Sequence, residues 1–283
     1  MFGLRKLGEW TLDNCGLFAN RVPKMISEFF NLEKKLSEQL LRLKGLGLCA
    51  VKAEFEAEGA SFRDLLRLRR FTSEHNIPLY LKIGGVEALR DLKDALDLGV
   101  DGVIAPMVES PFGVVKFFEA VELIFGGRKI FRSINIETRE ALEHIDDILE
   151  MARGKVENIT IGRTDLSRSY FDSAIQPDSP FIFDLVERLS YKVQSAGLGL
   201  TVGGSLTAES IRLFAERRKR LGGRVLSMET RKAVFPTDRI LEQKMILKES
   251  LRFEEIYLRF KLECEAWLSR SDQERLAKLK TRL

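Results

Sequence analysis

The chain has 283 residues, of which 45% are hydrophobic, and its 46 basic and 42 acidic residues give a net charge of +4. This composition provides a large buried core, but no apolar run approaches the roughly 18 residues that a membrane span requires. The N-terminal segment lacks the continuous apolar stretch of a secretory signal. The three cysteines are too few and too far apart for a disulfide framework or a thiolate metal site. We therefore expect a cytoplasmic chain that does not associate with membranes.

One dense basic run, residues 217–220, closes a helix-like pattern and contains no aromatic residue. Basic side chains are favoured at helix C-termini. We therefore interpret this run as a solvated helix end and expect no nucleic-acid partner.

Strand-like and helix-like segments alternate from residue 48 onward. The strand-like segments are 48–56, 78–83, 102–106, 129–136, 158–161, 198–202 and 224–228. The helix-like segments between them are 62–72, 86–98, 112–123, 141–152, 181–195 and 206–217. Short connections and continuously apolar strands indicate a parallel sheet that is buried on both faces. An open doubly wound sheet is the alternative, but no glycine-rich dinucleotide loop follows the first strand.

This pattern predicts a (β/α)8 TIM barrel, with the eighth strand either upstream, around residues 16–19, or absent. We expect one barrel domain spanning residues 1–283, with helical extensions at 1–46 and 237–283. Both extensions carry wide apolar stripes, which must cover another surface. That surface is the bottom of the barrel, a second copy of the chain or a helix of another protein, and a homo-oligomer is expected. The stripe residues are Leu32, Leu36, Leu40 and Leu43, then Ile246, Phe253, Tyr257, Phe260, Cys264 and Trp267.

Active sites of parallel barrels form where strands end. Glu137 and Asp165 follow neighbouring strands, so their carboxylates converge at one barrel mouth. Hard oxygen ligands with open positions suit Mg²⁺ or Mn²⁺. The alternative is that both residues cap the helices that follow them, and spacing alone does not decide between the two.

Two motifs in this order carry a family resemblance. They are Ile136-Glu137-Thr138-Arg139-Glu140-Ala141-Leu142 and Ile161-Gly162-Arg163-Thr164-Asp165-Leu166-Ser167, supported by the upstream segment 96–108. Over residues 48–235 the chain resembles the HpcH/HpaI aldolase and citrate lyase β-chain family, barrels that bind phosphoenolpyruvate or pyruvate. The resemblance implies metal-dependent cleavage or formation of a carbon–carbon bond beside a 2-oxo acid, with Glu137 and Asp165 as metal ligands. A divalent cation chelated by the keto acid would stabilise the enolate.

The chain departs from that family at four places. Lys82 stands where the family has an arginine that binds the keto acid, and a lysine lacks the guanidinium fork. An ungapped count puts Ala57 where the family has its base histidine, and His75 and His144 lie elsewhere. The segment between Met107 and Glu137 is short and lacks the glycine-rich substrate loop. Glu229 stands where the family often has an aspartate.

Other residues at strand ends are candidates for the missing roles. Glu54, Glu56 and Glu58 alternate, so in a strand they share one face, and Glu56 is our candidate for proton transfer unless the run leaves the strand. Arg163 is the candidate for binding a substrate carboxylate, with a surface ion pair as the alternative. Gly203, Gly204 and Ser205 either contact an anionic ligand or form a tight turn.

The sequence therefore predicts a divalent-metal-dependent carbon–carbon lyase or aldolase. Its expected substrate is a 2-oxo acid or a related carboxylate or phosphate. Two alternatives stay open. Lys82 could form a Schiff base with the substrate, or the chain could be a degenerate relative that binds a metabolite or another protein without catalysis.

Overall fold

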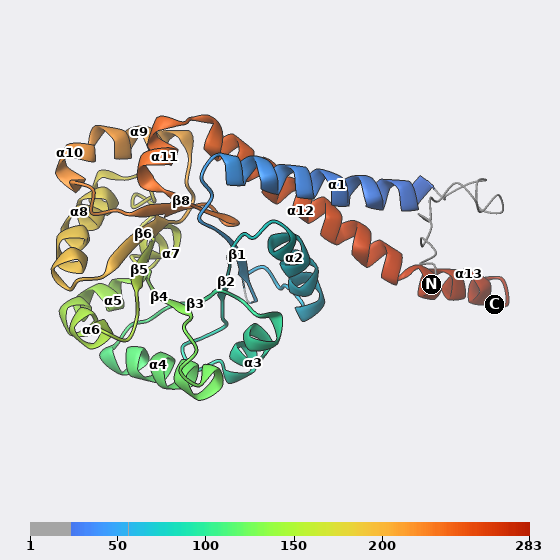
Figure 1. The fold of residues 1–283 in the computed structure, drawn as a ribbon, viewed down its shortest axis with the longest axis horizontal. Coiled ribbons are helices and arrows are strands. Elements are labelled where there is room, and N and C mark those ends of the chain that lie inside the picture. The colour runs from blue at the N-terminus through green and yellow to red at the C-terminus, as the bar shows by residue number, and fades with distance from the viewer. Residues whose placement is uncertain (1–23, 56) are drawn as a thin grey trace, which may run out of the picture. The chain divides into compact units, whose positions relative to one another are not determined.

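The computed structural model describes residues 24–55 and 57–283 and contains a closed eight-stranded barrel surrounded by helices (Figure 1). The strands are β1 (Ala50–Glu54), β2 (Leu79–Lys82), β3 (Gly102–Ala105), β4 (Phe131–Ile136), β5 (Asn158–Gly162), β6 (Gly199–Gly203), β7 (Ser227–Glu229) and β8 (Ala233–Pro236). They pair in chain order, and β8 closes the barrel onto β1. The predicted TIM-barrel fold with additional terminal helices is therefore confirmed.

The helices of the barrel wall lie between the strands. They are α2 (Phe62–Glu74), α3 (Leu89–Leu98), α4 (Pro111–Phe125), α5 (Arg139–Glu143), α6 (Ile145–Ala152), α7 (Arg163–Arg168), α8 (Pro180–Ser195), α9 (Ala208–Glu216), α10 (Arg218–Leu221) and α11 (Thr237–Glu242). The single helix expected over residues 141–152 is divided at His144, which ends α5 and precedes α6. Serine and threonine caps begin several of these helices, as with Ser61 before α2 and Thr207 before α9.

The eighth strand corrects the sequence prediction. β8 follows β7 after residues 230–232 and runs antiparallel to both β7 and β1. A parallel pair needs a crossover of a dozen or more residues, whereas so short a connection permits only a hairpin. Residues 16–19, the expected upstream location, lie outside the described residues. The hairpin places residues 230–232 at the C-terminal ends of the parallel strands, where the barrel mouth forms.

The interior of the barrel is unusually polar for a TIM barrel, whose interior is commonly filled by branched aliphatic side chains. Near the N-terminal ends of the strands, Tyr80 and Phe131 stack with ring centroids 4.6 Å apart. Above this stack, buried polar side chains form hydrogen bonds with one another. They include Asn158 Nδ2 donating to Ser133 Oγ (2.9 Å) and Thr201 Oγ1 donating to Asn158 Oδ1 (3.2 Å).

Two long helices and a short one complete the described chain: α1 (Lys24–Gly45), α12 (Met245–Leu268) and α13 (Arg270–Lys280). The chain separates into two compact units, one comprising Leu36–Tyr257 and the other comprising the described part of residues 1–35 together with Leu258–Leu283. Within the barrel unit, Gln39 Nε2 of α1 donates to Glu249 Oε2 of α12 at 2.8 Å. Within the second unit, Phe29 and Phe260 pack with centroids 5.4 Å apart.

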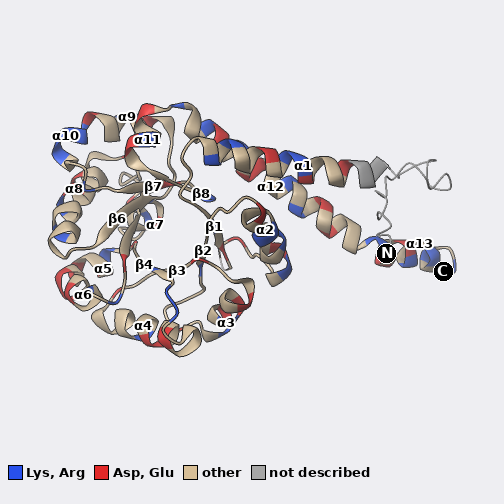
Figure 2. Cartoon of the chain, in the orientation of Figure 1, with Lys and Arg blue, Asp and Glu red and all other residues tan. Residues whose placement is uncertain are grey.

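The charged surface agrees with the interpretation of the basic run as part of a helix end. Lysine and arginine are interspersed with acidic residues along the barrel helices (Figure 2). In α10, Arg218 pairs with Asp238 at 2.8 Å and Arg220 with Glu187 at 3.8 Å. Among the helices that the structure describes, none combines the length and apolar character needed to cross a membrane.

A glycine at the base of the barrel provides a packing test. A Cβ atom at Gly102 would lie 2.6 Å from Tyr80 Cδ1 and 3.0 Å from Phe131 Cδ1. We predict that Gly102→Ala lowers the free energy of unfolding by about 1–3 kcal/mol through overpacking, measured by urea denaturation. Gly113→Ala in α4 is the matched control, because its Cβ would meet no atom closer than 3.6 Å. Equal stability of the two variants would contradict this account of the barrel base.

Candidate active site at the barrel mouth

A cavity of about 500 Å³ opens at the C-terminal ends of the parallel strands. It brings together Glu137, Asp165, Lys82, Gly204 and Ser205, all of which the sequence marked as candidates. Its wall also includes residues from the β7–β8 hairpin and from α12. The cavity is lined mainly by charged and polar groups, so it suits a small, highly charged ligand.

Glu137 lies immediately after β4, and its side chain is only 2% exposed. Met107 N donates to Glu137 Oε1 at 3.0 Å, and Asn135 Nδ2 donates to Oε2 at 3.0 Å. Burial raises the pKa of Glu137, and the charge of nearby Asp165 adds to this. Lys82 and the two hydrogen-bond donors oppose the shift. A Cβ atom at Gly162 would lie 2.9 Å from Glu137 Cβ, so the carboxylate occupies space that only a glycine leaves open.

Asp165 reaches the same cavity from the short helix α7. The sequence did not predict this helix, which begins directly at the end of β5. Residues two positions apart on a helix do not face each other, whereas those three apart lie on the same side. Asp165 therefore faces the mouth together with Arg168, while Arg163 points elsewhere. The pKa shift of Glu137 includes a contribution from Asp165, which is consistent with their proximity.

Neither carboxylate serves as the helix cap that was the alternative interpretation. Thr138 Oγ1 accepts the hydrogen bond from Ala141 N at the start of α5, so Glu137 is not needed there. At the start of α7, the cap position is Gly162, and no side chain caps that end. Neither side chain therefore accepts a capping hydrogen bond, although Asp165 lies in the first turn of α7, where the helix dipole favours an acidic residue.

The oxygen atoms at the mouth suit a hard divalent cation. Glu137 and Asp165 supply carboxylate oxygens, and the buried Asn135 Oδ1 beside them accepts no hydrogen bond from the residues that the structure describes. Within residues 24–55 and 57–283, no group of three or more His, Cys, Asp or Glu side chains is arranged to hold a metal. Mg²⁺ does not require such a group, since it is commonly bound by one or two carboxylates with water and substrate oxygens. The residues present are therefore compatible with Mg²⁺ or Mn²⁺.

Lys82 ends β2, and its Nζ atom lies 3.7 Å from Glu137 Oε1. This cation therefore stands at the edge of the two-carboxylate site, where the resemblance predicted an arginine. Its side chain is 15% exposed, so its amine is accessible from the cavity.

A second charged cluster forms the floor of the cavity. Lys52 Nζ lies 2.5 Å from Glu229 Oε1 and 3.4 Å from Glu54 Oε1, and all three side chains are buried. Burial by itself would lower the pKa of Lys52, but Glu229 and Glu54 outweigh it and hold that pKa above its usual range. Burial by itself would raise the pKa of Glu54, but nearby cations, Lys52 foremost, outweigh it and lower that pKa. The floor therefore holds one buried cation between two carboxylates, and Arg231, 4.0 Å from Glu54, supplies a second positive charge.

Arg163 does not occupy the position expected of a substrate-binding arginine. Its side chain is 0% exposed, and each of its five N–H groups donates to the protein. The acceptors are Gly203 O (3.1 Å), Gly204 O (2.9 Å), Pro177 O (3.1 Å), Asp178 Oδ1 (2.6 Å) and Ser210 Oγ (3.3 Å). Burial lowers the pKa of Arg163, with Asp178 opposing the shift. Arg163 therefore has a structural role in place of the expected carboxylate-binding one, and the alternative ion pair joins its buried guanidinium to the partly buried Asp178.

The Gly203–Ser205 segment is explained largely by packing. A Cβ atom at Gly204, whose φ is +84°, would lie 2.6 Å from Arg163 N, so this residue lets β6 approach the start of α7. Ser205 also has a positive φ, of 48°, and its hydroxyl lies 2.9 Å from Thr164 Oγ1. Gly204 and Ser205 line the cavity, while a Cβ at Gly203 would meet Glu229 Cγ at 2.8 Å. The segment therefore forms a tight turn whose last two residues are also accessible to a ligand.

The structure places the remaining candidate residues at several different positions. Glu56, the candidate for proton transfer, lies outside the described residues. Glu58 has left the strand and forms an ion pair with the buried Lys232, which ties the β7–β8 hairpin to the segment after β1. Ala57 lines the cavity, so the place that the resemblance assigns to a base histidine does face the mouth. His75 ends α2 and His144 separates α5 from α6, and neither lines this cavity.

Sequence reasoning missed several residues of the mouth. Asn135 precedes Glu137 by two positions, and the period of a strand could have placed it on the same face. Arg231 arrives through the unpredicted hairpin and lies 4.0 Å from Glu54 and from Glu254. Glu254 and Leu251 come from α12, so this part of the helix flanks the mouth and does not close the barrel bottom. Arg168 faces the mouth because α7 is helical.

Comparisons with known proteins support this fold. No protein-family model matches the chain, and no curated protein matches it either. An HpcH/HpaI aldolase from Desulfitobacterium hafniense DCB-2 shares 17% identity at a TM-score of 0.54, covering 66% of this chain and 78% of that one. An HpcH/HpaI aldolase/citrate lyase family protein from Burkholderia cenocepacia J2315 shares 14% sequence identity at a TM-score of 0.54. The match covers 90% of this chain and 99% of that one. The citrate synthase SbnG shares 19% sequence identity at a TM-score of 0.51, and the match covers 68% of this chain and 80% of that one.

These similarities establish the fold. The expected likeness to HpcH/HpaI aldolases and citrate lyase-type barrels is confirmed at that level, since solved structures with those names share this architecture. Identities of this size do not transfer a metal, a substrate or a catalytic residue to this chain. Those assignments depend on the geometry of the mouth itself.

The hydrogen bonds of the buried Arg163 side chain lead to a prediction about the free energy of unfolding. We predict that Arg163→Gln lowers the free energy of unfolding by about 3–5 kcal/mol, because it leaves Asp178 and the carbonyls of the Gly203–Ser205 turn without their partner. Chemical denaturation measures this, with Arg212→Gln on the exposed face of α9 as the control. A variant with parental stability that had lost ligand binding would instead restore the substrate-binding role.

Proposed function

We propose that this protein is a divalent-metal-dependent lyase that makes or breaks a carbon–carbon bond beside a 2-oxo acid. The observation that carries the proposal is the convergence of Glu137, Asp165, Asn135 and Lys82 in one cavity at the barrel mouth. The first three offer oxygen ligands, and the fourth offers a positive charge. The structural likeness to barrels named as aldolases supports the same class of reaction.

In this proposal, Glu137 and Asp165 would hold Mg²⁺ or Mn²⁺, with Asn135 Oδ1, unpartnered among the described residues, as a further oxygen beside them. When bound, such an ion supplies Lewis-acid stabilisation of the negative charge that develops on the keto oxygen. Met107 N and Asn135 Nδ2 keep the Glu137 carboxylate in one orientation through their hydrogen bonds. A rigid ligand of this kind reduces the reorganisation needed when the substrate reacts.

Lys82 in this proposal balances the negative charge of the substrate carboxylate. Its Nζ atom already lies 3.7 Å from Glu137, so its charge stands where two carboxylates and an acid substrate would meet. Lysine acts as a point charge and fixes a carboxylate less rigidly than an arginine fork. Glu56 stays our candidate for proton transfer, because Ala57 supplies no base.

The presence of Ala57 at the mouth favours a second candidate function, a binding protein without turnover. Such a protein would keep the metal ligands and bind a 2-oxo acid, but it would lack the group that moves the proton. Activity measurements with bound metal separate the two functions: turnover of any 2-oxo acid excludes the second one.

We predict that Mn²⁺ or Mg²⁺ binds the purified protein and that oxalate, a mimic of the pyruvate enolate, tightens this binding. Titration calorimetry measures both effects. Glu137→Gln and Asp165→Asn should each abolish metal binding while the fold is preserved, because each replaces a ligand oxygen by an amide of similar volume. Asp172→Asn, on the loop after α7 and outside the mouth cavity, is the matched control. If either mouth variant binds Mn²⁺ as well as the parent protein, the site assignment is wrong.

A further inference from the structure

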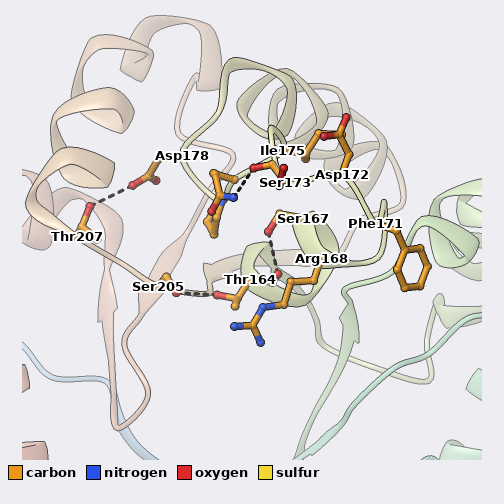
Figure 3. A pocket seen from close by; sticks show the side chains of 12 residues that line it. Thr164, Ser167, Arg168, Phe171, Asp172, Ser173, Ile175, Asp178, Ser205 and Thr207 are labelled. Carbon is orange, nitrogen blue, oxygen red and sulfur yellow. Dashed lines mark hydrogen bonds between the residues drawn. The ribbon is translucent and has the colours of Figure 1, made fainter.

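A second cavity, of about 660 Å³, adjoins the mouth on the side of α7 (Figure 3). Thr164, Arg168 and Ser205 line both cavities, so these three residues form their junction. The far wall of the second cavity comes from the segment that joins α7 to α8. The second cavity is therefore the space next to the mouth on this side, and Arg168 can be approached from the mouth.

Arg168 is the cation at this junction. Its side chain is exposed, and within the described part of the chain it forms no ion pair with a carboxylate. The other cations of the mouth form ion pairs within 4.0 Å: Lys52 with Glu54 and Glu229, Lys82 with Glu137, and Arg231 with Glu54 and Glu254. Arg168 thus keeps its guanidinium fork available for an anion that the protein itself does not supply.

The placement of Arg168 relative to Asp165 sets the distance to that anion. The two residues are three positions apart on α7, so their Cβ atoms lie roughly 5–6 Å apart on one side of the helix. Thr164 and Ser205 bring hydroxyl groups to the same junction, with their oxygens 2.9 Å apart. An anionic group bound there would lie several bonds from a keto acid held at Asp165 and Glu137.

The acidic side chains of the second cavity do not neutralise this cation. Asp178 accepts hydrogen bonds from Arg163, Ser210 and Thr207, so its negative charge is already paired with the Arg163 guanidinium. Asp172 accepts from Ala174 N within its own turn and lies beyond α7. Figure 3 shows Arg168 beside Thr164, with Asp172 and Asp178 farther along the cavity wall.

We infer that Arg168 recognises a second anionic group, so that the substrate is a 2-oxo acid carrying a distal carboxylate or phosphate. This inference rests on the proposed function, because the near end of the substrate is placed by Glu137 and Asp165. Lys82 stands where an arginine was expected, and all the N–H groups of Arg163 bind the protein. Arg168 would therefore supply the guanidinium that binds the substrate. A guanidinium binds either anion through two parallel N–H bonds.

Three ligands with the same 2-oxo acid end test the inference. They are 2-oxoglutarate, with a distal carboxylate; 4-phosphono-2-oxobutanoate, with a distal phosphonate; and 2-oxopentanoate, with a distal methyl group. Calorimetry in the presence of Mn²⁺ measures the affinity of each. We predict that at least one dianionic ligand binds about tenfold or more tightly than 2-oxopentanoate, in keeping with the strength of a hydrogen bond to a charged group. The better dianion identifies the distal group as carboxylate or phosphate.

Variants assign the preference to a residue. Arg168→Gln should abolish the preference for the dianion while 2-oxopentanoate keeps its affinity within about twofold, since the near end of the ligand is untouched. Arg231→Gln at the mouth and the exposed Arg90→Gln of α3 should keep the preference. Equal affinity of all three ligands for the parent protein, or a preference that survives Arg168→Gln, would overturn this inference while leaving the proposed function intact. If none of the ligands bound, and oxalate also failed to bind, the proposed function itself would fall, and the inference with it.

Discussion

The arrangement of the barrel mouth depends on the buried guanidinium of Arg163. Its five N–H groups bind the end of β6, the Gly203–Ser205 turn and Asp178, which joins the start of α7 to two neighbouring elements. A buried charge of this kind is stable only when all its donors are satisfied. Because this anchor fixes the beginning of α7, the side chains that follow it have determined directions: Asp165 faces the mouth, and Arg168 stands at its edge.

Charge balance is the second constraint on this site. At the floor of the cavity, Lys52 lies between Glu54 and Glu229, and Arg231 at 4.0 Å from Glu54 supplies the second positive charge for these two carboxylates. Above it, Glu137 pairs with Lys82 at 3.7 Å, and nearby Asp165 adds a second negative charge. Carboxylates held together without enough positive charge are costly in a buried site. A divalent cation would restore the balance there, while Arg168 would balance a charge brought by the ligand.

Much of this architecture could be predicted from the sequence. The apolar strands and amphipathic helices of residues 48–228 specify a parallel barrel, and the strand ends identify Glu137, Asp165 and Lys82 as neighbours at its mouth. The eighth strand was misplaced because its connection to β7 is only a hairpin, and strand periodicity does not reveal pairing direction. Arg163 was misassigned because a strand-end residue was assumed to face the mouth, whereas the helix begins at that residue and turns its side chain inward. Arg231, Glu254 and Arg168 reach the mouth through contacts between segments distant in the chain or through an unpredicted helix, so local patterns carried no signal for them.

The most direct test of this account is the position of a metal ion in a crystal of the protein grown with Mn²⁺ and oxalate. Anomalous scattering at the manganese absorption edge locates the ion without reference to any assumed site. We predict one strong peak at the barrel mouth, within coordination distance of a carboxylate oxygen of Glu137 and one of Asp165, with oxalate completing the ligands of the ion. A fully occupied peak elsewhere, or clear density for oxalate at the mouth with no metal between these two carboxylates, would contradict this account.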